Sequence, residues 1–325
     1  MNKNGIDSKK TNKRDACSFL LFVFLLPYVC ACLWGHVGEE TGKLKKDALN
    51  GQDAYMVEVT VDWGVWELPA EEYLAYRLAM TIPEGYHLEA KKAQAVLLRT
   101  ELAVLYQEAD GRSIMLDGEG LAKYYKDTGK ETEKALQESR QAVEDTKGMI
   151  LTCGGKPIRA SYFKLSNGFT REAKESGEEE CPYLTKTYCE EDQTSPDYHS
   201  AVRVDRERYI DAVQGILKEN FDRKIIWDGG EFSYDDSGYV TKVSYCDETG
   251  REEEVDGETF RHLFGLNSAS FEVKREETGV FFQVTGVGHG FGMSQFAANC
   301  RAENGQTYQE ILKSFFFQTE LAKFE

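Results

Sequence analysis

Glycine occupies every second position from Gly286 to Gly292, and His289 lies in the middle of this segment. In an extended backbone alternate residues face opposite sides, so one side of the segment would be bare backbone. Glycine weakens a strand, so four of them indicate the close approach of a ligand or of another backbone, or a tight bend that needs permissive φ angles. A single histidine among glycines is also typical of a structural turn. The spacing makes this segment the first candidate for a ligand site.

The residues after the glycines predict two helices that would hold the segment in place. Ser294 is placed to cap a short helix that runs through Ala298. Asn304-Gly305 predicts a turn, and Thr307 followed three residues later by Glu310 is the capping-box pattern that opens a last helix.

These C-terminal residues resemble the signature of the stage II sporulation protein D family, which also covers amidase enhancers. The matching stretches are GVGHGFGMSQFAA, residues 286–298, and GQTYQEILKSFF, residues 305–316. The resemblance implies a protein that handles the glycan strands of peptidoglycan during engulfment in spore-forming bacteria. The activity it implies is lytic transglycosylation of strands stripped of their stem peptides, together with stimulation of a partner amidase.

A second block that is similar to the family, residues 71–103, has a helix–proline–loop–helix pattern. The family places a catalytic glutamate two residues before the proline, and here Thr81 stands at that position before Pro83. Transglycosylation needs a carboxylic acid at the leaving oxygen, as glycoside hydrolysis does. A threonine hydroxyl cannot deliver a proton at neutral pH, and losing general acid catalysis lowers a rate by about 10²–10⁴-fold. We therefore expect no ordinary transglycosylase activity, with Glu84 as the candidate substitute acid or simply an exposed loop residue.

Arg99, in the same block, is predicted to face the glycan cleft, where its guanidinium would bind sugar or carboxylate oxygens. The alternative is a surface arginine paired with Glu101 or Glu89. A third block, residues 160–171, also matches, and many family members carry a histidine at the position of Phe163, a proposed metal ligand in some relatives. Phenylalanine cannot bind a metal, so we expect no zinc site of that kind and no cofactor. The substrate-binding residues that the resemblance implies are Arg99, Ser166, Gly168, Thr170, Arg171, Gly288, His289, Gly290, Ser294 and Gln295.

The N-terminus predicts a membrane anchor. Residues 1–15 are basic, residues 16–34 are apolar apart from Ser18, and residues 35–53 are polar. Nineteen apolar residues can just span a bilayer, and the preceding basic residues place the N-terminus in the cytoplasm. We therefore expect a cytoplasmic tail (1–15), a single-pass signal anchor (16–34), a linker (35–53) and an extracytoplasmic domain (54–325) at the cell membrane. A cleaved signal peptide or a lipidated Cys30 or Cys32 is the alternative.

Composition limits the partners. The net charge of −17 over 325 residues argues against nucleic acid, whose phosphates need a basic surface. The acidic runs are expected to be solvated faces. Five of the eight cysteines follow the predicted span, and their pairing does not follow from their spacing.

Periodicity predicts an α+β domain of mixed helices and antiparallel strands around the glycan-binding cleft. The expected strands include a half-buried one from Tyr55, a hairpin at residues 149–159, a pair at 238–245 and 251–255, and a last strand at 280–285. Helices are expected at 68–81, 88–109, 131–147, 205–221 and 259–263.

Two functions remain open from these residues. The first is an enzyme of glycan-strand remodelling that uses Glu84 or another acid. The second is a glycan-binding module without catalytic activity that presents strands to a cell-wall amidase of the sporulation machinery. A structural protein of the cell wall is a third interpretation.

Overall fold

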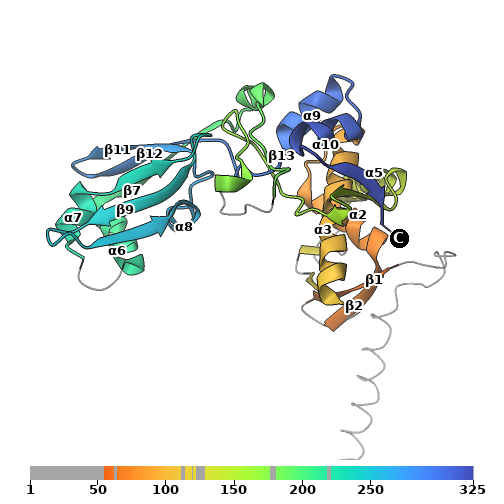
Figure 1. Cartoon of the computed structure of the whole chain (residues 1–325), viewed down its shortest axis with the longest axis horizontal. Coiled ribbons are helices and arrows are strands. Elements are labelled where there is room, and N and C mark those ends of the chain that lie inside the picture. The colour runs from red at the N-terminus through yellow and green to blue at the C-terminus, as the bar shows by residue number, and fades with distance from the viewer. Residues whose placement is uncertain are drawn as a thin grey trace, which may run out of the picture. The chain divides into compact units, whose positions relative to one another are not determined.

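The computed structural model describes residues 55–61, 64–110, 114–118, 120–121, 129–175, 181–217 and 221–324. The tail, the membrane span and the linker expected at the N-terminus lie outside these residues. Among the described residues no helix is both long and apolar enough to cross a membrane. Helices are mixed with antiparallel and parallel strands, so the α+β prediction is confirmed (Figure 1).

In chain order the elements are β1 (Met56–Val61), β2 (Gly64–Pro69), α2 (Ala70–Thr81), α3 (Leu88–Ala109), β3 (Met115–Asp117), α5 (Lys130–Asp145), β4 (Met149–Cys153), β5 (Lys156–Pro157), β6 (Tyr162–Phe163), the 3₁₀ helices η2 (Ala173–Glu175) and η3 (Glu190–Thr194), β7 (His199–Asp205), α6 (Arg206–Ile216), α7 (Arg223–Asp228), β8 (Glu231–Tyr234), β9 (Val240–Cys246), β10 (Glu252–Asp256), α8 (Gly257–Leu263), β11 (Phe271–Glu276), β12 (Gly279–Thr285), β13 (Met293–Ser294), α9 (Gln295–Glu303), α10 (Tyr308–Phe315) and β14 (Glu320–Lys323).

The first strand and the two helices after it follow from the sequence. Three valines at alternate positions are buried on one face of β1, as their spacing predicts. α2 starts after Pro69, whose fixed φ suits the entry to a helix, and ends at Thr81 because Ile82 precedes a proline and is extended. α3 has the predicted bounds and ends where Asp110 adopts a left-handed φ of 49°.

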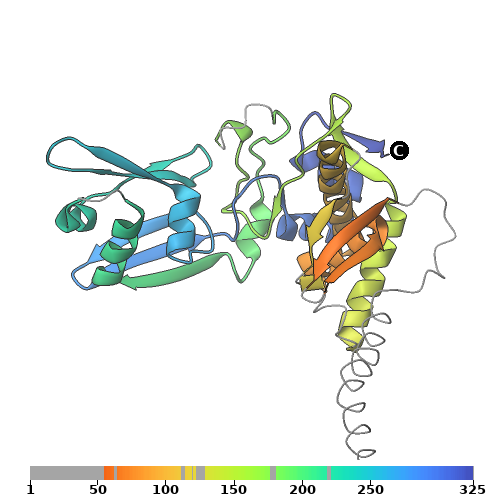
Figure 2. The same ribbon diagram turned by 90° about the horizontal axis from the view of Figure 1, so that it is seen from below.

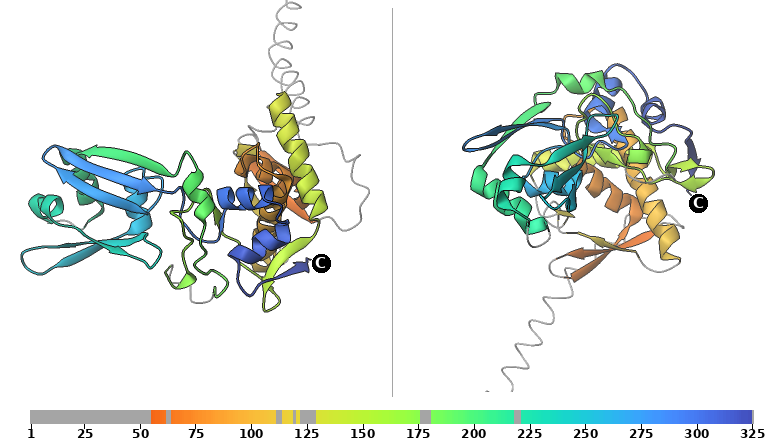
Figure 3. Two further views of the ribbon diagram at one scale, coloured as in Figure 1. Left: turned by 90° about the horizontal axis from the view of Figure 1, so that it is seen from above. Right: turned by 60° about the vertical axis from the view of Figure 1, so that its left-hand side comes forward.

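A first hydrophobic core is built mainly from α2, α3 and the sheet β2-β1-β3. β1 pairs antiparallel with β2 and parallel with β3. α5 packs against both α2 and α3 (Figure 2). The C-terminal helices α9 and α10 pack on α3, and β14 pairs with β4 of the predicted hairpin (Figure 3). The two ends of the described chain therefore share one core.

A second hydrophobic core is formed by residues 199–285, which interrupt the first. The antiparallel sheets β11-β12-β7 and β10-β9-β8 and the helices α6, α7 and α8 enclose it. Phe260, Phe264, Phe271 and Phe282 pack at its centre, with ring centroids 4.9 to 6.0 Å apart in their contacting pairs. Aromatic rings in edge-to-face and offset-stacked contact stabilise a core beyond the area that they bury.

The structure differs from the sequence expectations at several strands. β2, β7 and β11 were not predicted, because their mixed polar composition hides the alternation that marks a half-buried strand. β7 begins at His199, whose side chain is exposed and whose backbone pairs with Thr285. The helix predicted for residues 205–221 is shorter in the structure, where α6 ends at Ile216.

Candidate functional site

The glycine segment, residues 286–292, is not a regular strand. All four of its glycines have positive φ, from 79° to 113°, so the chain bends at every second residue. A Cβ added at Gly292 would lie 2.0 Å from the carbonyl oxygen of Ser161, and one at Gly290 would lie 2.7 Å from the Tyr239 ring. Both explanations that the spacing left open therefore apply, and what approaches these two glycines is the protein itself.

Backbone hydrogen bonds fix this segment to the third family-like block, more than a hundred positions earlier, and to a nearer stretch just before β11. Val287 exchanges hydrogen bonds with Leu165 over 2.7 and 3.0 Å, and Gly288 donates to the carbonyl of Asn267 over 2.8 Å. Gly290 accepts a hydrogen bond from the backbone N–H of Arg171 over 2.8 Å. The segment thus joins the third family-like block, residues 160–171, to the stretch just before β11.

His289 is held by the glycine segment itself. Its Nδ1 accepts a hydrogen bond from the backbone N–H of Phe291 over 3.1 Å, so in the neutral ring the proton is on Nε2. Burial lowers the pKa of His289 below its ordinary value, which favours the neutral ring at neutral pH. The imidazole packs against the ring of Phe163, with 5.6 Å between centroids.

Phe163 lies where the resemblance implies a histidine that is a proposed metal ligand in some relatives. Its ring packs on the imidazole of His289 and has no atom that can bind a metal, so the residues present do not fit that site. In the described part of the chain no group of three or more His, Cys, Asp or Glu side chains is placed to hold a metal ion.

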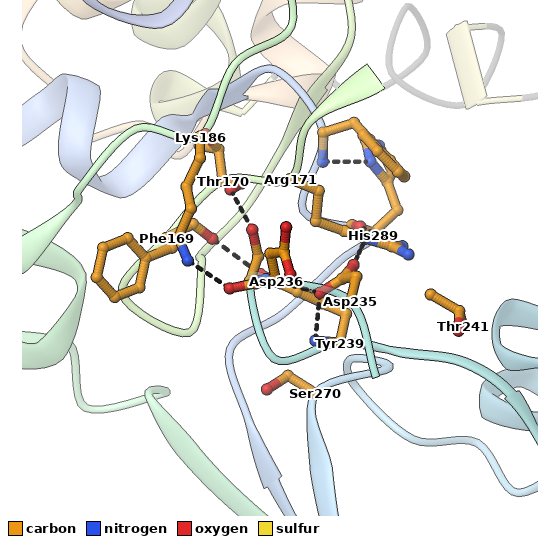
Figure 4. Close-up of polar contacts among 12 residues, drawn as sticks. Phe169, Thr170, Arg171, Lys186, Asp235, Asp236, Tyr239, Thr241, Ser270 and His289 are labelled. Atoms are coloured by element: carbon orange, nitrogen blue, oxygen red, sulfur yellow. Dashed lines mark hydrogen bonds and ion pairs between the residues drawn. The ribbon is translucent and has the colours of Figure 1, made fainter. Parts of the chain in front are cut away.

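Arg171 lies beneath the glycine segment and is almost fully buried. Its Nε forms an ion pair with Oδ2 of Asp235 at 2.5 Å, and its Nη1 donates to the carbonyl of His289 over 3.3 Å. The guanidinium also lies 4.4 Å from the centroid of the Phe291 ring. Figure 4 shows Arg171 with Asp235, Tyr239 and His289. These contacts use the side chain inside the protein, so Arg171 fixes the segment instead of facing a glycan.

Asp192, which the sequence analysis did not single out, connects two of the predicted site residues. Its Oδ2 accepts from the backbone N–H of Ser166 over 2.8 Å, and its Oδ1 accepts from Oγ of Ser294 over 2.9 Å. Burial raises the pKa of Asp192 to about 6, although its hydrogen bonds with the two serines act in the opposite direction. No sequence signal marks this residue, because it ends the acidic run Glu190–Asp192 and such runs are usually solvated.

The remaining residues of the third block are also internal. Thr170 is buried, and its hydroxyl donates to the carbonyl of Thr185 and accepts from the backbone N–H of Thr187. Gly168 has a φ of 108° and donates its N–H to the hydroxyl of Ser166. Ser166, Gly168 and Thr170 therefore shape this loop, and their side chains and backbone are hydrogen-bonded to the protein.

Thr81 lies at the C-terminal end of α2, where two other segments meet it. Its carbonyl oxygen accepts a hydrogen bond from Nε2 of Gln295, at the start of α9, over 3.1 Å. The same amide donates to Oε1 of Gln94, on α3, over 3.1 Å. The hydroxyl of Thr81 donates to the carbonyl of Arg77, one helical turn earlier. Thr81, which the resemblance predicts to stand at the position of the family's catalytic carboxylate, thus has a hydroxyl that is bound to its own helix.

Tyr162 completes this group, which we call the Thr81 cluster: Thr81, Gln94, Tyr162 and Gln295. β6 pairs in parallel with β13, which places Tyr162 opposite Met293 and beside the start of α9. Burial raises the pKa of Tyr162 above its ordinary value, as does the charge of Glu101, whereas Arg77 and a hydrogen bond with Thr81 lower it. The cluster therefore joins α2, α3, β6 and α9, and Tyr162 is a member that the sequence analysis did not name.

Arg99 does not face a cleft, contrary to the prediction. It is 3% exposed, and its Nε and Nη2 donate to the two carboxylate oxygens of Glu71 over 2.8 and 2.7 Å. Nη1 and Nη2 also donate to the carbonyls of Met149 and Val143. The surface pairing with Glu101 or Glu89 is equally wrong, because this arginine ties α2 and α5 to α3.

Glu84 lies on the exposed turn between α2 and α3. Its carbonyl oxygen accepts from Nζ of Lys91 over 2.7 Å. Within the described ranges its carboxylate has no hydrogen bond or ion pair, so nothing directs it to Thr81.

The structure is that of a mixed α+β protein. The sequence blocks that resemble the family meet at the glycine segment and at the Thr81 cluster. The sequence model of the stage II sporulation protein family (SpoIID) matches residues 63–153. The stage II sporulation protein D of Bacillus subtilis (strain 168) is 30% identical over 281 residues, which cover 81% of this chain and 77% of the relative. The protein of the same name from Bacillus amyloliquefaciens is 29% identical over 282 residues, with the same coverage of both chains.

A third relative carries a different name. The amidase enhancer of Bacillus subtilis (strain 168) is 27% identical over 289 residues, which cover 75% of this chain and 39% of that protein. Together with the matches above, this shows that the chain belongs to the stage II sporulation protein D family.

Proposed function

We propose that this protein binds glycan strands of peptidoglycan in the cell wall of a sporulating bacterium and presents them to a partner amidase without cutting them. Membership of the family supports a role in the sporulation cell wall. The similarity to a protein named amidase enhancer supports the amidase as partner. We further propose that residues 16–34 anchor the protein in the cell membrane with the rest of the chain outside.

The observation that carries the absence of cutting is the hydrogen bonding of Thr81. General acid catalysis needs a group that can donate a proton near neutral pH. The Thr81 hydroxyl has no such proton and is bound to the carbonyl of Arg77. Among the described residues, the carboxylate that acts on the Thr81 cluster is that of Glu101, through its charge near Tyr162.

Binding of a strand is supported by the polar groups that remain in the cluster. The Gln94 Nε2 is buried and has no hydrogen-bond partner in the described chain. Buried polar groups are nearly always hydrogen-bonded, so an acceptor oxygen brought to this place would satisfy it. The hydroxyl of Tyr162 adds a second group of the kind that binds sugar hydroxyls.

The alternative is an enzyme of glycan-strand remodelling. The observation on its side is that Glu84 has a free carboxylate on the turn that directly follows α2. We place it second because this carboxylate is exposed and no contact among the described residues directs it to Thr81.

A paired digestion assay separates these functions. Full-length protein is incubated with glycan strands stripped of peptides, binding is measured by co-sedimentation, and anhydro-muramyl products are measured by mass spectrometry. We expect wild type to bind strands and release no product, and Thr81→Glu to gain measurable cleavage. Glu84→Gln should behave as wild type. Cleavage by wild type that Glu84→Gln abolishes would establish the enzyme instead, and wild type that fails to bind strands would refute both functions.

A further inference from the structure

A pocket of about 410 Å³ opens between α2, α3 and β3. Most of the residues that line it are apolar, among them Leu74 and Met80 from α2 and Leu98 and Leu105 from α3. Pockets of about 300–1,000 Å³ are typical of sites that bind small molecules and combine apolar walls with a few polar groups. The charged groups here are Arg77 and Glu101, one on each helix and of opposite sign.

The two charges do not neutralise each other. In the part of the chain that the structure describes, neither the Arg77 guanidinium nor the Glu101 carboxylate has an ion-pair partner. Arg77 is half-buried and Glu101 is exposed at the rim. By contrast, Glu71 and Glu72, also on α2, are paired with Arg99 and Arg140. A cation and an anion that line one pocket and stay unpaired suit a ligand that carries both charges.

The pocket adjoins the Thr81 cluster. Arg77 precedes Thr81 by one helical turn on α2, and Glu101 follows Gln94 by seven residues on α3, so each charge lies on the same helix face as a member of the cluster. Both charges also act on the hydroxyl of Tyr162. A strand bound at the cluster would therefore bring whatever it carries towards the pocket.

We propose that this pocket binds the short peptide attached to a peptidoglycan strand, with Arg77 on a carboxylate of the peptide, Glu101 on an ammonium, and the leucines around its small apolar side chains. A guanidinium binds a carboxylate through two parallel N–H donors, which gives the contact its orientation. The inference rests on the proposed function, because it takes the strand at the Thr81 cluster as given.

This assignment changes which strands the protein takes. The family resemblance implies strands already stripped of peptides, whereas a peptide pocket selects strands that still carry them. Those are the substrates of an amidase, which cuts between glycan and peptide. A protein that cannot cut glycan and holds the peptide would position that bond for its partner.

The test compares three ligands with the full-length protein by titration calorimetry: strands that carry peptides, the same strands stripped by an amidase, and the free peptide. We expect wild type to bind peptide-bearing strands about tenfold more tightly than stripped ones, the effect of about one charge-assisted hydrogen bond. Arg77→Gln and Glu101→Gln should each remove this preference. Glu108→Gln, an exposed acid on α3 away from the pocket, should keep it.

Blocked peptides assign each charge to its partner. Strands with an amidated peptide carboxylate should bind wild type and Arg77→Gln equally and still respond to Glu101→Gln. Strands with an acetylated ammonium should show the reverse pattern. If each variant loses affinity for all ligands alike, the two residues act on the strand and the pocket assignment is wrong.

The remaining outcomes separate the two proposals. Equal binding of peptide-bearing and stripped strands by wild type would overturn the peptide pocket and leave the proposed function standing. A preference that survives both variants would place the peptide elsewhere and also overturn it. No binding of either strand would overturn the proposed function and the pocket together.

Discussion

The side-chain amide of Gln295 donates a hydrogen bond of 3.1 Å to the carbonyl oxygen of Thr81, which lies 214 residues earlier in the chain. Through this bond the start of α9 caps the C-terminal end of α2, whose last carbonyls have no partner within the helix. The end of α2 carries Thr81, the position at which the resemblance predicts the family's catalytic acid. The C-terminal signature therefore contributes to holding that helix end in position.

Replacing Gln295 tests this link. Gln295→Ala removes the donor to Thr81 and to Gln94 and leaves a buried carbonyl unsatisfied, so the free energy of unfolding should fall by about 1–3 kcal/mol. Urea unfolding at constant pH measures it. Gln306→Ala, at an exposed position after α9, is the control and should change little. Equal stabilities of the two variants would mean that the bond does not hold α2.

Arg99 is predicted to be important for stability and not for binding. Arg99→Ala leaves the half-buried Glu71 without its partner and should lower the free energy of unfolding by about 1–3 kcal/mol, as losing hydrogen bonds to a charged group does. Arg99→Lys keeps the charge but not the two parallel donors, so it should fall between Ala and wild type. Arg203→Ala, at a side chain that is 59% exposed, is the control. An Arg99→Ala protein that melts like wild type but no longer binds strands would restore the original binding role.

Two glycines with similar backbone angles allow the free-energy cost of a left-handed backbone to be measured apart from that of a steric clash. Gly292 and Gly305 have φ of 79° and 89°, but only at Gly292 would a Cβ meet another atom closely, the Ser161 carbonyl oxygen at 2.0 Å. Gly305→Ala should cost about 1–2 kcal/mol from the left-handed backbone alone. Gly292→Ala should cost about 1–3 kcal/mol more, because the neighbouring backbone must move. Thermal unfolding of both variants measures the difference, and equal losses would contradict the close approach.

Asp192 should make stability depend on pH. Burial raises its pKa from 3.8 to about 6, so folding favours the protonated carboxyl. Its stabilising contribution is complete below pH 3.8 and is lost as the pH rises to about 6, with a total of roughly 3 kcal/mol for a shift of about two units. Asp192→Asn cannot ionise. Between pH 4 and 7 the free energy of unfolding should therefore fall in wild type relative to the variant, and parallel pH profiles would show that Asp192 does not titrate in this range.

The proposed anchor makes a separate prediction. Expressed in bacteria, the full chain should fractionate with membranes, and protease added from outside should digest it, because residues 16–34 are apolar and follow a basic tail. Deleting residues 1–34 behind a cleavable signal should release it. A soluble protein whose mature chain begins after residue 34 would show that the segment is a signal peptide.

Local patterns in the sequence were sufficient for much of the fold. The alternating valines of β1, the proline before α2 and the capping box of α10 were each visible in the sequence, and each appears in the structure. These features depend on neighbouring residues only, on side-chain alternation, on a fixed φ and on donors at a helix start. The resemblance of the glycine segment likewise identified the family.

The partners of the site residues were decided by tertiary structure alone. Arg99 and Arg171 look like free cations in the sequence, but folding brings Glu71 from 28 positions away and Asp235 from 64 positions away to bind them. Asp192 looks like part of a solvated acidic run, but it is buried between Ser166 and Ser294. Desolvation and ion pairing depend on which distant segments pack together, and no local pattern encodes that. The sequence therefore determined the family and predicted a missing acid at Thr81, whereas the fold decided which polar groups are structural and which, such as Arg77 and Glu101, have no ion-pair partner among the described residues.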